Sequence, residues 1–162
     1  MTRSFVALTD GLSRIFAVIS VLLLISSVLV ICQMISLRYF FQMPTIWQTD
    51  FVVYAATASI FLGAPYVLLT RGHVGVDVVE NLLHGQARAV LRAIANLLGF
   101  IFCALMCAAS AYYLWEAWSL GWKTSNVWQI PVWIPAFPMP VGFFLLCLQY
   151  IAEFLRPGEQ QP

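Results

Sequence analysis

Two cysteines one helical turn apart are the first residues in this sequence whose spacing could do chemistry. Cys103 and Cys107 stand four residues apart, which places both thiols on one face of a helix. Paired thiols can bind a soft metal or exchange disulfides. However, these two cysteines, like Cys32 and Cys147, lie in long apolar stretches and form no Cys-x-x-Cys pair. We therefore expect all four to be packing residues.

The second candidate group surrounds the two histidines, His73 and His84. Haem ligation inside a membrane needs histidines on facing helices, whereas both of these stand in one charged segment between apolar stretches. Asp77 and Glu80 share a helical face with His84, which is typical of a solvated stripe. The sequence contains no phosphate-binding glycine loop and no pair of catalytic carboxylates. We expect neither an enzyme nor a cofactor or metal site.

The amino-acid composition indicates what kind of protein carries these residues. The 162 residues are 62% hydrophobic and 9% charged, with a mean hydropathy of +0.87, whereas soluble domains are about 25% charged. Eight basic and seven acidic side chains are too few to keep a particle of this size dispersed in water. The net charge of +1 gives no basic field, which argues against nucleic acid as a partner. The chain is predicted to be an integral membrane protein in contact with lipids.

Four stretches without ionisable side chains are long enough to cross a bilayer, which takes about 20 apolar residues. The first stretch is longer than the apolar run of about 7–15 residues in a cleavable signal, so we expect it to be retained. The last stretch contains four prolines, and because the first helical turn tolerates proline, its helix should begin at Pro138. The predicted fold class is an all-α integral membrane protein with four transmembrane helices, in a single membrane domain over residues 1–162. The expected spans are 15–37, 51–70, 93–115 and 138–155.

Two connecting segments carry patterns of their own. Between the second and third spans, polar residues recur every three or four positions, which predicts a cytoplasmic amphipathic interfacial helix over residues 74–92. Residues 122–137 combine prolines with Trp122, Trp128 and Trp133. We expect that segment to be irregular backbone at headgroup depth, where indoles settle.

Basic residues set the expected orientation. With four spans, both termini and the second loop share one side, which carries six basic residues against two on the other. The six are Arg3, Arg14, Arg71, Arg88, Arg92 and Arg156, and the two are Arg38 and Lys123. The positive-inside rule then places both termini in the cytoplasm.

The expected spans lack the groups that a transport site uses. Ionisable side chains within a membrane are costly and usually mark a substrate or ion pathway, and of Asp, Glu, Lys, Arg and His these spans contain only Glu153, in the last turn of the fourth. Gln33, Asn96 and Gln149 are their carboxamides, and we expect Asn96 and Gln149 to form hydrogen bonds between helices rather than to touch substrate. A small membrane protein without a site is typical of an accessory subunit.

Several short motifs occur in an order that is similar to a known family. They are Arg38-Tyr39-Phe40-Phe41, Pro44, Trp47 and Asp50, then Phe61-Leu62-Gly63-Ala64, Arg71-Gly72-His73-Val74-Gly75-Val76-Asp77, Ile130-Pro131-Val132-Trp133, Pro140-Val141-Gly142-Phe143 and Leu148-Gln149. Over about Arg14 to Phe154, the chain resembles the small membrane subunit, of the DctQ type, of tripartite ATP-independent periplasmic (TRAP) transporters. The family often has two adjacent acidic residues after the tryptophan, and here those positions read Thr49-Asp50.

The resemblance implies a three-part, sodium-coupled transporter that imports an organic acid such as a dicarboxylate or a sugar acid. A periplasmic substrate-binding protein would deliver the acid, and a large multi-span membrane subunit would hold the substrate and sodium sites and move as an elevator. This chain would be the static scaffold in the bacterial inner membrane. The family-matched positions expected to contact a partner or to position the chain in the membrane are Arg38, Trp47, Asp50, Arg71, Gly72, His73, Asp77, Pro131, Trp133, Pro140 and Gly142.

Two other functions remain as alternatives. An independent small carrier or channel, working as a homo-oligomer, is disfavoured because the spans lack charge. A membrane enzyme or redox anchor is disfavoured by the positions of the cysteines and histidines.

Overall fold

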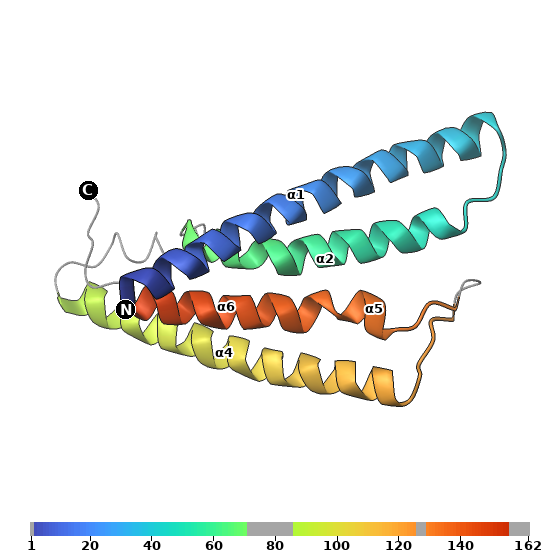
Figure 1. Ribbon diagram of the computed structural model, residues 1–162. Coiled ribbons are helices and arrows are strands. Elements are labelled where there is room, and N and C mark those ends of the chain that lie inside the picture. Colours follow the sequence, from blue (N-terminus) through green and yellow to red (C-terminus); the bar gives the residue numbers. More distant parts are fainter. Residues whose placement is uncertain (1, 71–85, 126–128, 156–162) are drawn as a thin grey trace.

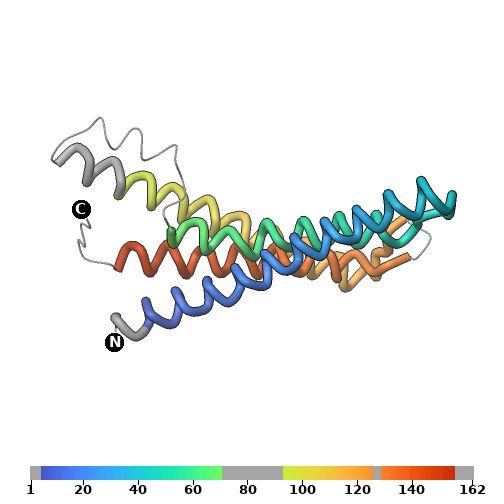
Figure 2. The backbone as a smooth tube through the Cα atoms, turned by 90° about the horizontal axis from the view of Figure 1, so that it is seen from above, coloured from blue at the N-terminus to red at the C-terminus, as the bar shows by residue number. Residues whose placement is uncertain are grey.

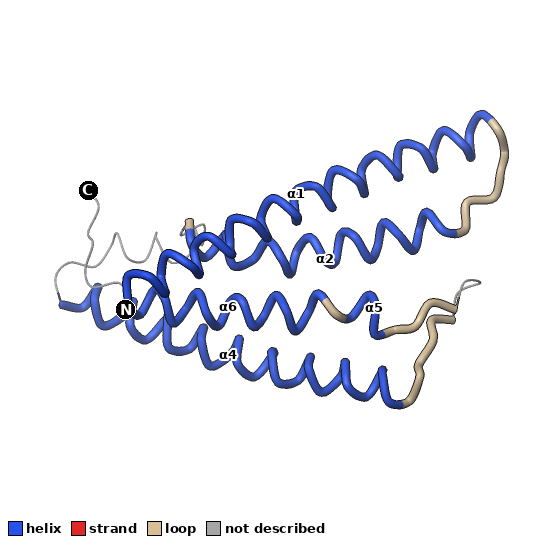
Figure 3. Tube along the Cα trace, in the orientation of Figure 1, coloured by secondary structure: helices blue, strands red, loops and turns tan. Residues whose placement is uncertain are grey.

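The computed structural model describes residues 2–70, 86–125 and 129–155. Its four long apolar helices confirm the predicted all-α membrane fold class. These helices are α1 (Thr2–Phe40), α2 (Trp47–Leu69), α4 (Gln86–Ser119) and α6 (Pro138–Leu155), and a single-turn helix, α5 (Trp133–Ala136), precedes α6 (Figures 1 and 3). Helix α6 begins at Pro138, as the prolines indicate, because a first turn has no hydrogen bond to lose.

The helices lie side by side in the order α1, α2, α6, α4 (Figure 1). Helix α6 is central and packs against α1, α2 and α4. We call the end that holds residues 41–46 and 120–125 the distal end, and the end that holds the start of α1 and the end of α6 the terminal end. Seen from above, α1 crosses over the other helices along its length (Figure 2). At 1.5 Å per residue, α1 is about 58 Å long and α6 about 27 Å. At the distal end, the hairpin of α1 and α2 reaches further than α4 and α6 (Figure 1).

Small residues bring the helices together. Ser20 of α1 donates a hydrogen bond of 2.7 Å to the carbonyl of Ser59 in α2. Gly63 of α2 lies against the same serine, since a Cβ there would stand 2.7 Å from Ser20 Oγ. Gly99 of α4 meets the phenol of Tyr150 in α6 in the same way. Close approach at glycine and serine is how helices pack in lipid, where apolar burial gives no driving force.

The interfacial helix expected over residues 74–92 is not confirmed. Residues 74–85 lie outside the described part of the chain. Residues 86–92 belong to α4, which continues without a break into the third span, so no helix ends at residue 92. The boundary between the interfacial helix and the third span was inferred from the last charged residue, Arg92. A helix can carry charged residues beyond the hydrocarbon without ending there.

The segment 122–137 was expected to be irregular throughout, and the structure corrects this. Two backbone hydrogen bonds, from Thr124 N to Ile130 O and from Val132 N to Trp122 O, both 2.9 Å, pair its two ends. Its last residues form α5, which contains Pro135. That proline is the third residue of α5, in the first turn, where a missing N–H costs no hydrogen bond.

Candidate partner-binding and membrane-positioning site

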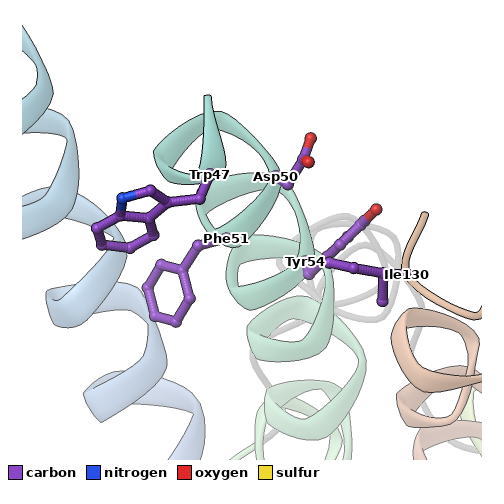
Figure 4. Close-up of a pocket in the computed structure, with 5 residues that line it drawn as sticks. All are labelled: Trp47, Asp50, Phe51, Tyr54 and Ile130. Atoms are coloured by element: carbon purple, nitrogen blue, oxygen red, sulfur yellow. The ribbon is translucent and has the colours of Figure 1, made fainter. Parts of the chain in front are cut away.

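Trp47 and Asp50 occupy the first turn of α2 at the distal end, where a carboxylate is favourable to the helix dipole. They line a pocket of about 210 Å³ with Phe51, Tyr54 and Ile130 (Figure 4). The rings of Trp47 and Phe51 lie 6.4 Å apart, edge to face, on the side of α2 toward α1 (Figure 4). Asp50 and Tyr54 point away from these rings (Figure 4).

This pocket is unsuited to an organic acid. Its lining is aromatic and aliphatic apart from Asp50 and the tip of Tyr54, and a carboxylate repels an anionic substrate. Within residues 2–70, 86–125 and 129–155, no group of three His, Cys, Asp or Glu side chains could hold a metal ion. The arrangement can contact lipid or a protein.

Pro131 and Trp133 lie close to the end of α4. Pro131 forms an isolated antiparallel bridge with Lys123. The ring of Trp133 lies 4.8 Å from that of Trp118 in α4. Aromatic pairs at this distance add about 0.5–1.5 kcal/mol beyond area burial. Pro131 and Trp133 therefore attach the segment between α4 and α6 to the end of α4.

Pro140 and Gly142 lie in the first turns of α6 and make contacts between helices. The carbonyl of Pro140 lies 3.9 Å from the sulfur of Cys107 in α4, within reach of a weak thiol hydrogen bond. Gly142 meets the backbone of Phe61 in α2, and the neighbouring Phe143 ring lies 5.4 Å from the Phe61 ring. Both positions thus hold α6 against its neighbours.

The remaining predicted positions are separate. Arg38 is the basic residue in the last turn of α1 and is exposed. Arg71, Gly72, His73 and Asp77 lie outside the described residues. The family-matched positions that the structure describes therefore form a distal group and a packing group rather than one site.

A polar cluster at the terminal end was only partly predicted. Ser13 donates a hydrogen bond of 3.0 Å to Gln149 Oε1, and Gln149 Nε2 donates one of 3.2 Å to Asp10. Ser13 and Gln149 are each 1% exposed. The hydrogen bond from Gln149 to another helix is confirmed. The sequence analysis missed Ser13 and Asp10 because both precede the uncharged stretch. In the structure α1 already begins at Thr2, so both residues belong to this helix.

In the part of the chain that the structure describes, four apolar helices are joined by buried polar groups that bond to one another, and this arrangement defines a multi-pass membrane protein. Comparison with known proteins identifies its family. Residues 27–158 match the DctQ component of tripartite ATP-independent periplasmic transporters, and the chain belongs to this family. The fold and the family together support a multi-pass protein of the bacterial inner membrane.

Three relatives are each named "C4-dicarboxylate TRAP transporter small permease protein DctQ". The protein from Pseudomonas aeruginosa is 34% identical over 99 residues, which is 60% of this chain and 47% of the relative. The protein from Rhodobacter capsulatus is 24% identical over 117 residues, 70% of this chain and 51% of the relative. The protein from Vibrio cholerae is 24% identical over 124 residues, 76% and 48% respectively. The chain thus aligns with about half the length of these relatives.

Proposed function

We propose that this chain is the small scaffold subunit of a TRAP transporter. The match over residues 27–158 carries the proposal. The buried polar groups support it: Ser13 and Gln149 bond to each other, as do Ser20 and Ser59, so these side chains are engaged in packing. A subunit of this kind braces a moving partner and takes no direct part in substrate binding.

The substrate class and the partners follow from the relatives' names and from the resemblance. The substrate is an organic acid, with C4-dicarboxylates favoured because three relatives are named for them. Sodium coupling and the substrate site belong to a large multi-span membrane subunit, to which a periplasmic binding protein delivers the acid. The middle of each span in this chain carries no Asp, Glu, Lys, Arg or His, which is consistent with that division.

The proposed orientation places both termini in the cytoplasm and the distal end in the periplasm. Six basic residues against two favour it by the positive-inside rule. The described distal connections, with Pro131 and the tryptophans, would then face the side from which a binding protein arrives.

Purification of this chain from its native membrane in mild detergent tests the proposal. A large multi-span protein should co-purify, and liposomes with both subunits should import the acid only when the binding protein is added. Liposomes that hold this chain alone should show no uptake. Uptake by the chain alone would instead establish an independent carrier, and a chain that purifies without any membrane partner would contradict the scaffold function.

A further inference from the structure

Helix α1 has two opposite faces of different character. Its buried face carries small hydroxyl side chains seven residues apart, Ser13, Ser20 and Ser27. The opposite face, which we call the outer stripe, follows helical spacings of three and four residues. It consists of six exposed residues, Leu22, Ile25, Leu29, Gln33, Ser36 and Phe40. The outer stripe is therefore apolar apart from Gln33 and Ser36.

The outer stripe lies at an edge of the bundle. Helix α1 is the first in the row α1, α2, α6, α4 (Figure 1). Ser13 and Ser20 on the buried face bond to α6 and α2, so the stripe on the other side of α1 points away from both helices. Helix α4 forms the opposite edge of the row. A subunit that braces a membrane partner has these two edges to offer.

Gln33 distinguishes the α1 edge. Within the four spans that the structure describes, Gln33 is the only exposed carboxamide, and no described residue forms a hydrogen bond with it. Ser36 differs, because its hydroxyl donates a hydrogen bond of 2.9 Å to the carbonyl of Cys32 in its own helix. The Gln33 amide therefore needs a partner from outside the described chain, and Ser36 does not.

The position of Gln33 along α1 keeps its amide away from water. The apolar run of α1 ends at Leu37, and Gln33 lies about 7.5 Å before Arg38 along the helix axis. Helical side chains lean toward the N-terminus of their helix, so this one points away from Arg38 and toward the middle of the run. Hydrocarbon offers no hydrogen bond to such an amide, whereas a second helix can.

The α4 edge makes no such demand. In the described span Ala93–Ser119, no exposed side chain is a carboxamide. The exposed hydroxyl of Ser119 donates its hydrogen bond to the Glu116 carbonyl. Leu98 and Leu105 are typical of this edge and are both 62% exposed. Lipid can cover such a surface without leaving a carboxamide unpaired.

We propose that the outer stripe of α1 is the surface that binds the large multi-span membrane subunit. A transmembrane helix of that subunit lies along the stripe, and one of its polar side chains bonds to the Gln33 amide. The α4 edge faces lipid. This contact rests on the proposed function, because it takes the partner from there and adds the face that holds it.

Photo-crosslinking in the native membrane tests which edge is occupied. p-Benzoylphenylalanine replaces Leu29 in one variant and Leu105 in the other, two leucines of similar exposure, 64% and 62%. The large subunit carries its own tag, so that a cross-linked product is recognised by that tag. Position 29 should give a product that contains the large subunit, and position 105 should give none.

Variants at Gln33 test the hydrogen bond separately. Gln33→Leu should raise the dissociation constant between the two subunits about threefold, the average effect of a hydrogen bond between membrane helices. Gln33→Asn retains an amide and should restore part of the loss. Ser36→Ala is the matched control on the same stripe and should change nothing. The unfolding of the isolated chain should be unaffected in all three.

The outcomes separate this contact from the function on which it rests. If the large subunit co-purifies but cross-links from position 105, or from neither position, the contact is wrong and the scaffold function stands. A product made of two copies of this chain at position 29 would assign the stripe to a homodimer. An unchanged dissociation constant in Gln33→Leu would exclude the hydrogen bond. A large subunit that does not co-purify at all would refute the proposed function and this contact together.

Discussion

Gly142 of α6 lies directly against the main-chain carbonyl of Phe61 in α2. A Cβ atom at position 142 would stand 2.5 Å from that oxygen and 2.8 Å from its carbon. The same carbonyl has no ordinary helical partner, because the residue four positions later is Pro65, which has no N–H. Only the Cα–H groups of a glycine fit beside the freed oxygen, a weak contact that recurs between packed helices. The glycine of one helix thus accommodates the proline of another.

Gly142→Ala should therefore destabilise the bundle. The added methyl would meet backbone atoms, which cannot rotate away, and overpacking of this kind costs about 1–3 kcal/mol. Thermal unfolding in detergent measures the loss. Gly11→Ala is the matched control, since nothing lies within 4 Å of a Cβ there and alanine in a helix is favoured over glycine by about 0.5–1 kcal/mol. Equal stability of the two variants would contradict the close approach.

Gln149→Ala should loosen α1 from α6 and leave substrate affinity nearly unchanged. The amide bonds to both Ser13 and Asp10, and losing buried hydrogen bonds costs about 1–3 kcal/mol. A residue that bound a charged substrate would instead cost about 2–5 kcal/mol of binding energy. In liposomes with the whole transporter, the apparent substrate constant should change by less than about fivefold, which is below about 1 kcal/mol.

Gln33→Ala is the control for that experiment. Gln33 is also a carboxamide within a span, but it is exposed, so its replacement should change neither stability nor substrate affinity. Loss of activity in Gln149→Ala should follow loss of assembled complex. A hundredfold change in substrate or sodium dependence, with assembly intact, would place this chain in the transport path and refute the scaffold function.

Replacing all four cysteines with serine or alanine should leave transport largely intact. Cys103 is buried and Cys32 is exposed, and small packing losses of about 1 kcal/mol each are expected. Transport by the complex in liposomes is the measurement, with the amount of assembled complex as its control. Loss of transport in a variant that still assembles would show that a thiol has a functional role.

Gln48→Met should keep or raise the stability of the isolated chain. Gln48 is 5% exposed, and its Oε1 accepts no hydrogen bond from the residues described. A buried oxygen without a donor costs about 1–3 kcal/mol, and methionine has a similar length without that oxygen. Ser20→Ala is the contrasting variant, because it removes a donor that is in use. A loss of stability in Gln48→Met comparable to that in Ser20→Ala would mean that the amide has a partner.

Reporter tags test the proposed orientation. Tags at both termini and near Gly85 should be cytoplasmic, and tags near Met43 and Thr124 should be periplasmic, since six basic residues favour the cytoplasmic side. Alkaline phosphatase and fluorescent-protein fusions report the two sides independently. Periplasmic phosphatase activity at either terminus would reverse the assignment.

The amino-acid sequence by itself determined the fold class and the first residue of α6. In lipid every backbone polar group must be satisfied within the chain, so an uncharged stretch of sufficient length has only the helix available to it. Charge gaps and prolines are local features, and they can be read without knowing any neighbour. The roles of Arg71, Gly72, His73 and Asp77 remain predictions from the resemblance, as do those of Arg38 and the other family-matched positions.

Only the tertiary structure decided which residues meet between helices. The helices are apolar on nearly all sides, so periodicity does not reveal which face of each turns inward. That choice depends on rotation about each helix axis and on close approach at single small residues. The contact of Gly142 with Phe61 and the bond of Ser13 to Gln149 join residues far apart in the chain. No local pattern encodes such pairs, because each contact exists only once both helices are packed.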